Sequence, residues 1–172
     1  MAATNHRRYT VEPLSADEIR RSFVNSSRSL VKAMTLPRDF DVLPWENLDY
    51  LGWRDPKAPA RGYLVLRRDE GVTGIAVTTA ATGAPRRGTG LCDLCHTAHQ
   101  VTDVSLFVAR RAGSAGKAGN TVGTYICADL ACSLYLRGLK ELEVPQSDLA
   151  GPEVRAGRLN ERLETFVGRV LG

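Results

Sequence analysis

The chain has 172 residues, 43% of them hydrophobic, and its 23 basic and 19 acidic side chains give a formal net charge of +4. No stretch approaches the roughly 20 apolar residues of a membrane-spanning helix, and the first residues contain no apolar run of signal-peptide length. These features argue against a membrane protein, and we expect a cytoplasmic one with a single compact unit and an auxiliary N-terminal portion.

The first predicted element is a helix over residues 16–34. Ser15 and Glu18 have the spacing of a capping box, in which each side chain bonds the backbone N–H of the other residue. Pro37 follows and should end the helix. Apolar residues recur between them at helical spacing, namely Ile19, Phe23, Leu30 and Met34.

Residues 45–56 hold both tryptophans of the chain beside leucines and a tyrosine. Such a cluster packs in a core more often than it recognises a partner, and both interpretations stay open. Residues 63–66 and 72–77 have strand-like composition and are joined through residues 67–71, which predicts a hairpin. Residues 82–90, rich in Gly, Pro and Arg, are predicted to form a linker.

All four cysteines fall in two pairs, Cys92 with Cys95 and Cys127 with Cys132. Structural zinc takes four ligands in a tetrahedron, and two short pairs supply two ligands each, so the spacing predicts a four-thiolate zinc site. A helix is predicted over residues 129–137, with Asp129 as its N-cap residue. Cys132 would lie in its first turn, where free N–H groups and the helix dipole favour a thiolate.

Other roles for these cysteines are less consistent with the sequence. Disulfides need an oxidising compartment. Cys92, Cys95 and His96 match the motif for covalent haem attachment, but that chemistry belongs to exported chains and leaves the second pair unused. A redox pair usually accompanies a βαβ pattern, which is not evident. His96 or His99 can also bind zinc, but four cysteines already fill its coordination sphere, so both histidines are expected at the surface or behind the ligands.

Two more strands are predicted over residues 101–108 and 121–126, separated by a loop over residues 113–119. A cysteine knuckle, a hairpin and a helix in this order are typical of a treble clef. After Gly151 and Pro152, the spacing of the apolar residues predicts an amphipathic C-terminal helix with Leu159, Leu163, Phe166 and Val170 on one face. We therefore predict an α+β fold: an N-terminal helical and Trp-rich segment (residues 1–60), then a β-containing zinc domain with a C-terminal helix (residues 61–172).

The excess positive charge lies in residues 61–120, which hold eight basic and four acidic side chains. It can offset the local charge of −2 that zinc with four thiolates carries, or it can attract an acidic protein or RNA surface. The most loop-like basic residues are Arg86, Arg87, Arg110, Arg111 and Lys117.

An enzyme is not predicted. Four thiolates leave zinc no open position for a water molecule, so the metal should be structural. An acid–base site can be imagined from Asp93, His96, His99 and Asp103, but no catalytic motif accompanies them. Residues 113–117 lack the register of a phosphate-binding loop.

Taken together, the motifs resemble the elongation factor G-binding family, whose best-known members protect bacterial translation from fusidic acid. The resemblance covers residues 10–171 and implies a helical N-terminal portion before a treble-clef zinc domain that contains a β-sheet. It also implies that the zinc domain binds elongation factor G and helps it leave the ribosome, without chemistry on the partner. The motifs are Ser22-Phe23-Val24-Asn25, Leu36-Pro37, residues 45–56, the pair Cys92 and Cys95, and Tyr125-Ile126-Cys127 with Cys132.

The resemblance also implies a contact surface of aromatic and basic groups beside the zinc knuckle. Tyr125, two residues before Cys127, is the first predicted partner contact, although a strand tyrosine also packs readily within a sheet. Arg110, Arg111 and Lys117 follow because of their charge. The alternative function is a zinc-containing RNA- or DNA-binding protein that uses residues 61–120 against phosphates.

Overall fold

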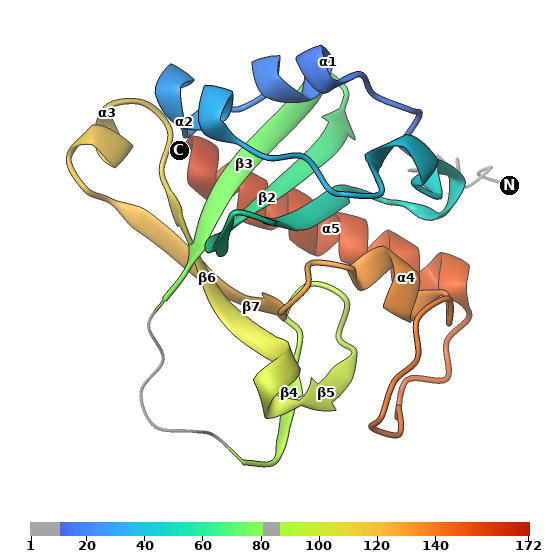
Figure 1. Ribbon diagram of the computed structural model, residues 1–172. Helices are drawn as coiled ribbons and strands as arrows, with labels where there is room; N and C mark the ends of the chain where they lie inside the picture. The colour runs from blue at the N-terminus through green and yellow to red at the C-terminus, as the bar shows by residue number, and fades with distance from the viewer. Residues whose placement is uncertain (1–10, 81–86) are drawn as a thin grey trace, which may run out of the picture.

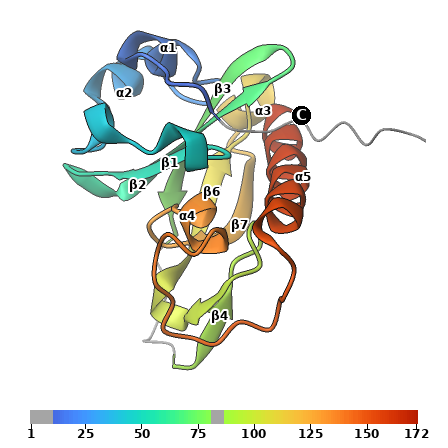
Figure 2. The same cartoon turned by 90° about the vertical axis from the view of Figure 1, so that its right-hand side faces the viewer.

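The computed structural model describes residues 11–80 and 87–172. Within them the central feature is an antiparallel sheet of five strands in the order β1-β2-β3-β6-β7. The sheet lies between helix α5 (Pro152–Leu171) on one side and the N-terminal helices on the other (Figure 1, Figure 2). Its strands are β1 (Leu51–Asp55), β2 (Ala58–Arg68), β3 (Gly71–Thr79), β6 (Val104–Arg110) and β7 (Thr121–Cys127). This arrangement confirms the predicted α+β class.

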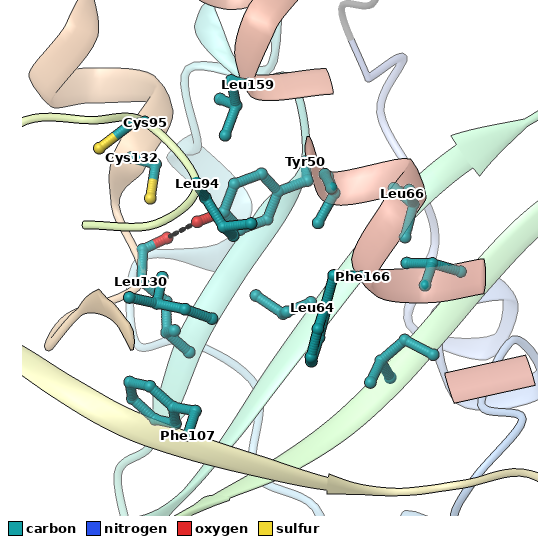
Figure 3. Packing of buried hydrophobic residues seen from close by; sticks show 14 of the residues in the cluster. Tyr50, Leu64, Leu66, Leu94, Cys95, Phe107, Leu130, Cys132, Leu159 and Phe166 are labelled. Carbon is teal, nitrogen blue, oxygen red and sulfur yellow. Dashed lines mark hydrogen bonds between the residues drawn. The ribbon is translucent and has the colours of Figure 1, made fainter. Parts of the chain in front are cut away.

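Helix α5 covers one face of the sheet, as the spacing of its apolar residues predicts. Pro152 stands in its first turn, where the missing N–H costs no helical hydrogen bond. Leu159 and Phe166 pack in one cluster with sheet residues such as Leu64 and Phe107 (Figure 3). All four cysteines belong to the same cluster, so the helix, the sheet and the cysteines share one core.

The N-terminal residues form a second cluster on the other side of the sheet. The rings of Trp53 and Tyr63 lie 4.9 Å apart between centroids, and Phe23 packs edge-on against Tyr63 at 5.6 Å. Trp45 is half-buried and packs edge-on against Phe40. Both tryptophans therefore contribute to packing, which is the first of the two interpretations of residues 45–56.

The prediction of one helix over residues 16–34 is wrong. The chain forms two short helices, α1 (Ala16–Arg21) and α2 (Arg28–Ala33), and the predicted capping box of α1 is present. Between them the backbone bonds β3: the N–H of Gly74 donates to Ser22, and the N–H of Val24 donates to Gly74. The side chain of Ser27 then caps α2. Contacts with a distant strand thus override a local helical pattern.

Other elements differ from their predictions mainly in extent. The hairpin of β2 and β3 is confirmed, with longer strands than predicted. Residues 101–103 form a 3₁₀ turn before β6, and helix α4 (Cys132–Leu136) is shorter than the predicted 129–137. The prediction of a loop over residues 113–119 is wrong, because these residues contain the short helix α3 (Gly113–Lys117). Residues 82–86 of the predicted linker, which include Arg86, lie outside the described residues.

The predicted boundary at residue 60 lies within strand β2, which pairs with β1. The division into residues 1–60 and 61–172 stays a prediction. Among the described residues, no helix combines the length and the apolar character needed to cross a bilayer.

Candidate metal centre

The first cysteine pair lies in the turn between two short strands, β4 (Thr89–Leu91) and β5 (Ala98–Gln100). The N–H of His96 donates to the carbonyl of Cys92 at 2.9 Å, and the N–H of Cys95 points at the Cys92 sulfur at 3.4 Å. His96 has a φ of 53°, a left-handed conformation that turns the chain back into β5. This tight turn brings both sulfurs to one side of the hairpin.

The second pair joins β7 to α4, because Cys127 ends the strand and Cys132 begins the helix. Leu130 between them has a φ of 62°, and its N–H donates to the Cys127 carbonyl at 2.8 Å. A carboxylate oxygen of Asp129 accepts from the N–H of Ala131 at 3.0 Å. Cys132 therefore lies in the first turn of a helix as predicted, but Ala131, not Asp129, is the N-cap residue.

The two pairs meet in one cluster whose four sulfur atoms all lie within 4.8 Å of one another. The separation is 3.7 Å between Cys92 and Cys132 and 3.6 Å from Cys127 to both Cys95 and Cys132. Four sulfurs about 2.3 Å from a tetrahedral zinc ion lie about 3.8 Å apart, whereas a disulfide needs about 2.05 Å. The cysteines are free, and their spacing suits zinc.

All four cysteines are buried, and none exposes more than 2% of its surface. Burial raises the pKa of the Cys132 thiol well above its ordinary value, because a thiolate loses its hydration there. A divalent cation among the sulfurs reverses that cost and keeps the thiols ionised. With four thiolate ligands the coordination sphere is closed, so zinc here holds structure and offers no position for a reacting water.

The two neighbouring histidines have different surroundings. His96 is exposed. His99 exposes only 4% of its surface, and its Nε2 lies 3.2 Å from the Cys127 sulfur. Its ring packs edge-on against Tyr135, with 4.7 Å between the centroids. An imidazole N–H in this position supports the negative charge of a thiolate from behind the ligands.

Residues outside the motif hold the cluster in place. The hydroxyl of Tyr50 donates to the carbonyl of Leu130 at 2.9 Å (Figure 3). Asp93 ties the first cysteine turn to β7: its N–H donates to the Tyr125 carbonyl at 2.8 Å, and its carboxylate accepts from the Tyr125 N–H at 2.7 Å. Both turns are therefore fixed to the sheet.

Sequence reasoning missed Tyr50, and no local signal marks it, because its partner lies 80 residues away. It also missed the contacts of Asp129. Burial opposes ionisation of this carboxyl, but hydrogen bonds from Lys140, Ala131 and Tyr135 hold its pKa below the ordinary value. The acidic residue between the cysteines is thus a fixed anion that positions the turn before α4.

The imagined acid–base site finds no support in the structure. Asp93 bonds the backbone of β7, and the backbone carbonyl of Asp103 accepts from the N–H of Ala128. His96 is exposed, while His99 is buried against Cys127. Asp93 and His99 therefore support the metal turns.

The structure brings two of the predicted partner contacts to one face of the β6–β7 hairpin. Tyr125 lies opposite Leu106, and Arg110 lies opposite Thr121. The alternate residues of β6 are buried beneath α5, so the side chains of Leu106, Val108 and Arg110 share the other face. Arg111 follows the strand and is half-buried, and Lys117 is exposed on α3. Their roles as partner contacts stay predictions.

A sequence model of the FBP C-terminal treble-clef zinc-finger family matches residues 18–170. The match runs from α1 into the last turn of α5 and contains both cysteine pairs. Neither the curated proteins nor the solved structures contain a match to the chain. The matched family and the buried cysteine cluster agree on a treble-clef zinc finger.

Proposed function

Since the chain belongs to the FBP C-terminal treble-clef zinc-finger family, we propose that it is a zinc-stabilised cytoplasmic adaptor that binds translation elongation factor G and promotes its release from the ribosome. The observation that carries this proposal is the buried, closed cluster of four cysteines. Zinc bound there supplies folding energy and no open coordination site. What the cluster organises is a surface, which suits a binding protein.

The surface in question is the exposed side of β6 and β7. Asp93 holds the backbone of Tyr125 through one hydrogen bond from its N–H and one to its carboxylate, so the metal turn sets the position of this residue. Tyr125 and Leu106 are half-buried, and Arg110 is exposed at the end of the hairpin. Tyr125 and Arg110 lie on one face of the strand pair, and both residue types are enriched in binding hot spots.

Release of the factor needs no chemistry on it. An adaptor shifts a two-state partner only through a difference in affinity for the two states. We infer that the β6–β7 surface binds the ribosome-free conformation of elongation factor G more tightly than the bound one. The side chains of the adaptor supply contacts, and its zinc holds those contacts rigid.

Binding to RNA or DNA is the alternative function. Its main support is the excess of basic side chains in residues 61–120, and the structure weakens that support. Two of the basic residues in the 61–120 segment are neutralised by carboxylates of the chain itself. Arg67 forms an ion pair with Glu12 at 3.6 Å, and Arg68 forms one with Glu164 at 2.9 Å. Fewer cations are therefore free for phosphates than the sequence indicates.

Calorimetric titration of the zinc-loaded protein into elongation factor G from its own organism tests the proposal. We expect saturable binding that Cys127→Ser abolishes, because loss of one thiolate unravels the metal turn. A titration with RNA over a range of salt concentrations runs in parallel. No binding to the factor at tens of micromolar, together with RNA binding that weakens steeply with salt, would favour the nucleic-acid alternative.

A further inference from the structure

A cleft of about 230 Å³ opens where β3 meets β6, on the side of the sheet that carries the N-terminal helices. We call it the β3–β6 cleft. Its lining includes Leu30, Arg61, Thr78, Val108, Arg110 and Thr121.

The cleft exists because β3 and β6 pair at only two neighbouring positions, Thr78 with Val108 and Thr79 with Phe107. The two strands diverge on the N-terminal side of Thr78. Asn25 spans the gap between the two backbones. Its Nδ2 donates to the carbonyls of Ala76 and Arg110, both at 2.9 Å, and its Oδ1 accepts from the Ala76 N–H at 2.8 Å. These main-chain groups are satisfied, so the opening is a stable part of the fold.

Two cations border the cleft, Arg61 from β2 and Arg110 from β6. Across residues 11–80 and 87–172, neither of them forms an ion pair. Arg67 and Arg68, further along β2, both pair with glutamates. Arg61 and Tyr63 both line the cleft, and burial together with the Asp55 carboxylate raises the pKa of Tyr63 to about 12, a shift that Arg61 opposes. No ion pair among the described residues therefore neutralises the positive charge of the cleft.

The remaining lining combines hydroxyls with hydrocarbon. Thr121 is exposed and offers a hydroxyl group, the Thr78 hydroxyl donates to the Val108 carbonyl at 3.5 Å, and the side chains of Val108 and Leu30 provide apolar walls. A carboxylate would find two guanidinium groups and the Thr121 hydroxyl here, and hydrocarbon attached to it would find an apolar wall. Sites for cofactors and drug-sized ligands measure about 300–1,000 Å³. The smaller volume of this cleft matches one or two protein side chains.

We propose that the β3–β6 cleft receives an acidic side chain of elongation factor G together with an adjacent apolar one, and that Arg61 is therefore a partner contact beside Arg110. The inference rests on the proposed adaptor function. Val108 and Arg110 lie on the same face of β6 as Leu106, which is opposite Tyr125, so the cleft continues the predicted contact surface. It adds a residue from β2, outside the cysteine motif.

A protein side chain suits the cleft better than a nucleic-acid backbone does. Nucleic-acid grooves align many cations along a track and add aromatic platforms for bases. Here two cations converge on one small hollow with apolar walls. That geometry recognises a single anionic group and its hydrocarbon stem.

Charge reversal of the two arginines tests the inference. Arg61→Glu and Arg110→Glu should each raise the Kd for elongation factor G about tenfold or more, and the wild-type Kd should rise with salt. Arg169→Glu is the matched control, because Arg169 is exposed on α5 across the sheet. Zinc content and the thermal midpoint establish that each variant is folded. Arg61→Gln and Arg110→Gln provide milder replacements if a reversal disturbs folding.

The outcomes separate this inference from the function on which it rests. If the wild type binds and neither reversal changes the Kd, the cleft inference is wrong and the adaptor function stands. If the wild type does not bind elongation factor G, the adaptor function fails and the inference falls with it. If the reversals abolish binding of a single-stranded RNA oligonucleotide while the Kd for the factor stays constant, the cleft is a phosphate site and the inference is overturned.

Discussion

At the scale of single residues, His99 shows how a side chain outside the cysteine motif can tune the metal. Its Nε2 lies 3.2 Å from the Cys127 sulfur. His99→Phe keeps a ring against Tyr135 but removes the N–H, and we expect zinc affinity to fall about tenfold, as is usual for groups that support metal ligands. Competition with a chromogenic chelator measures this affinity.

His96→Asn is the matched control for that variant. His96 is exposed, and Asn tolerates its φ of 53° better than most non-glycine residues do. Its zinc affinity should stay at the wild-type value. An equal loss in both variants would show that the hairpin turn, and not the contact with Cys127, determines the affinity.

The surroundings of Asp55 lead to a second prediction, which concerns the pH dependence of stability. Burial favours its neutral form, but hydrogen bonds from the N–H groups of Lys57 and Thr35 and from the Tyr63 hydroxyl hold the pKa of Asp55 below its ordinary value. The unfolded chain therefore takes up this proton at higher pH than the folded one does. The contribution of Asp55 to stability is complete above about pH 5 and declines as the pH falls through 4 towards the folded-state pKa.

Asp55→Asn should accordingly make the free energy of unfolding less dependent on pH between about 5 and 3. Urea titrations at a series of pH values measure this dependence. The variant will be less stable than the wild type at neutral pH, and the difference should shrink in acid. A difference that stays constant with pH would mean that the carboxylate charge contributes nothing.

At the scale of elements, patterns of residues close in sequence were sufficient to predict much of the fold. The periodicity of α5, the β2–β3 hairpin and the two cysteine turns all depend on residues that are close in sequence. The break between α1 and α2 is different, because it depends on Gly74 and on Asn25, which bonds Ala76 51 residues away. Helix α3 also escaped prediction, since its glycines normally indicate a loop. Where the outcome depends on distant partners, sequence periodicity alone cannot reveal it.

The ion pair of Asp49 and Arg137 joins the N-terminal segment to α4. The two groups meet at 2.5 and 3.0 Å, and the Asp49 side chain is only 2% exposed. Arg137→Met leaves this carboxylate buried without its cation, and we expect the free energy of unfolding to fall by about 3–5 kcal/mol. Chemical denaturation measures the loss.

Arg158→Met is the control for that prediction. Its partner Asp148 is 31% exposed and Arg158 itself is 48% exposed, so the pair is hydrated. Removing it should cost less than about 1 kcal/mol. Similar losses for both variants would mean that burial adds nothing to the pair between Asp49 and Arg137.

At the scale of the whole molecule, the two hydrophobic clusters are linked across the sheet. Tyr50 comes from the Trp-rich segment but packs with the cysteines, where it bonds the Leu130 carbonyl. Asp49 beside it pairs with Arg137, and its N–H donates to Ser133 on α4 at 2.9 Å. Strand β1 also pairs with β2 along its length. The N-terminal segment therefore depends on the turn that the metal holds.

This linkage predicts that zinc removal destabilises both clusters together. Structural zinc contributes about 10–16 kcal/mol in small zinc-finger peptides, as much as the whole stability of a domain, about 5–15 kcal/mol. Both tryptophans lie in the N-terminal cluster, so their fluorescence reports that cluster, whereas circular dichroism reports the whole chain. After chelation we expect the two signals to change in one coincident transition at a lower midpoint. If tryptophan fluorescence instead keeps the midpoint of the zinc-loaded protein, the first 60 residues fold on their own and the predicted division of the chain is a physical one.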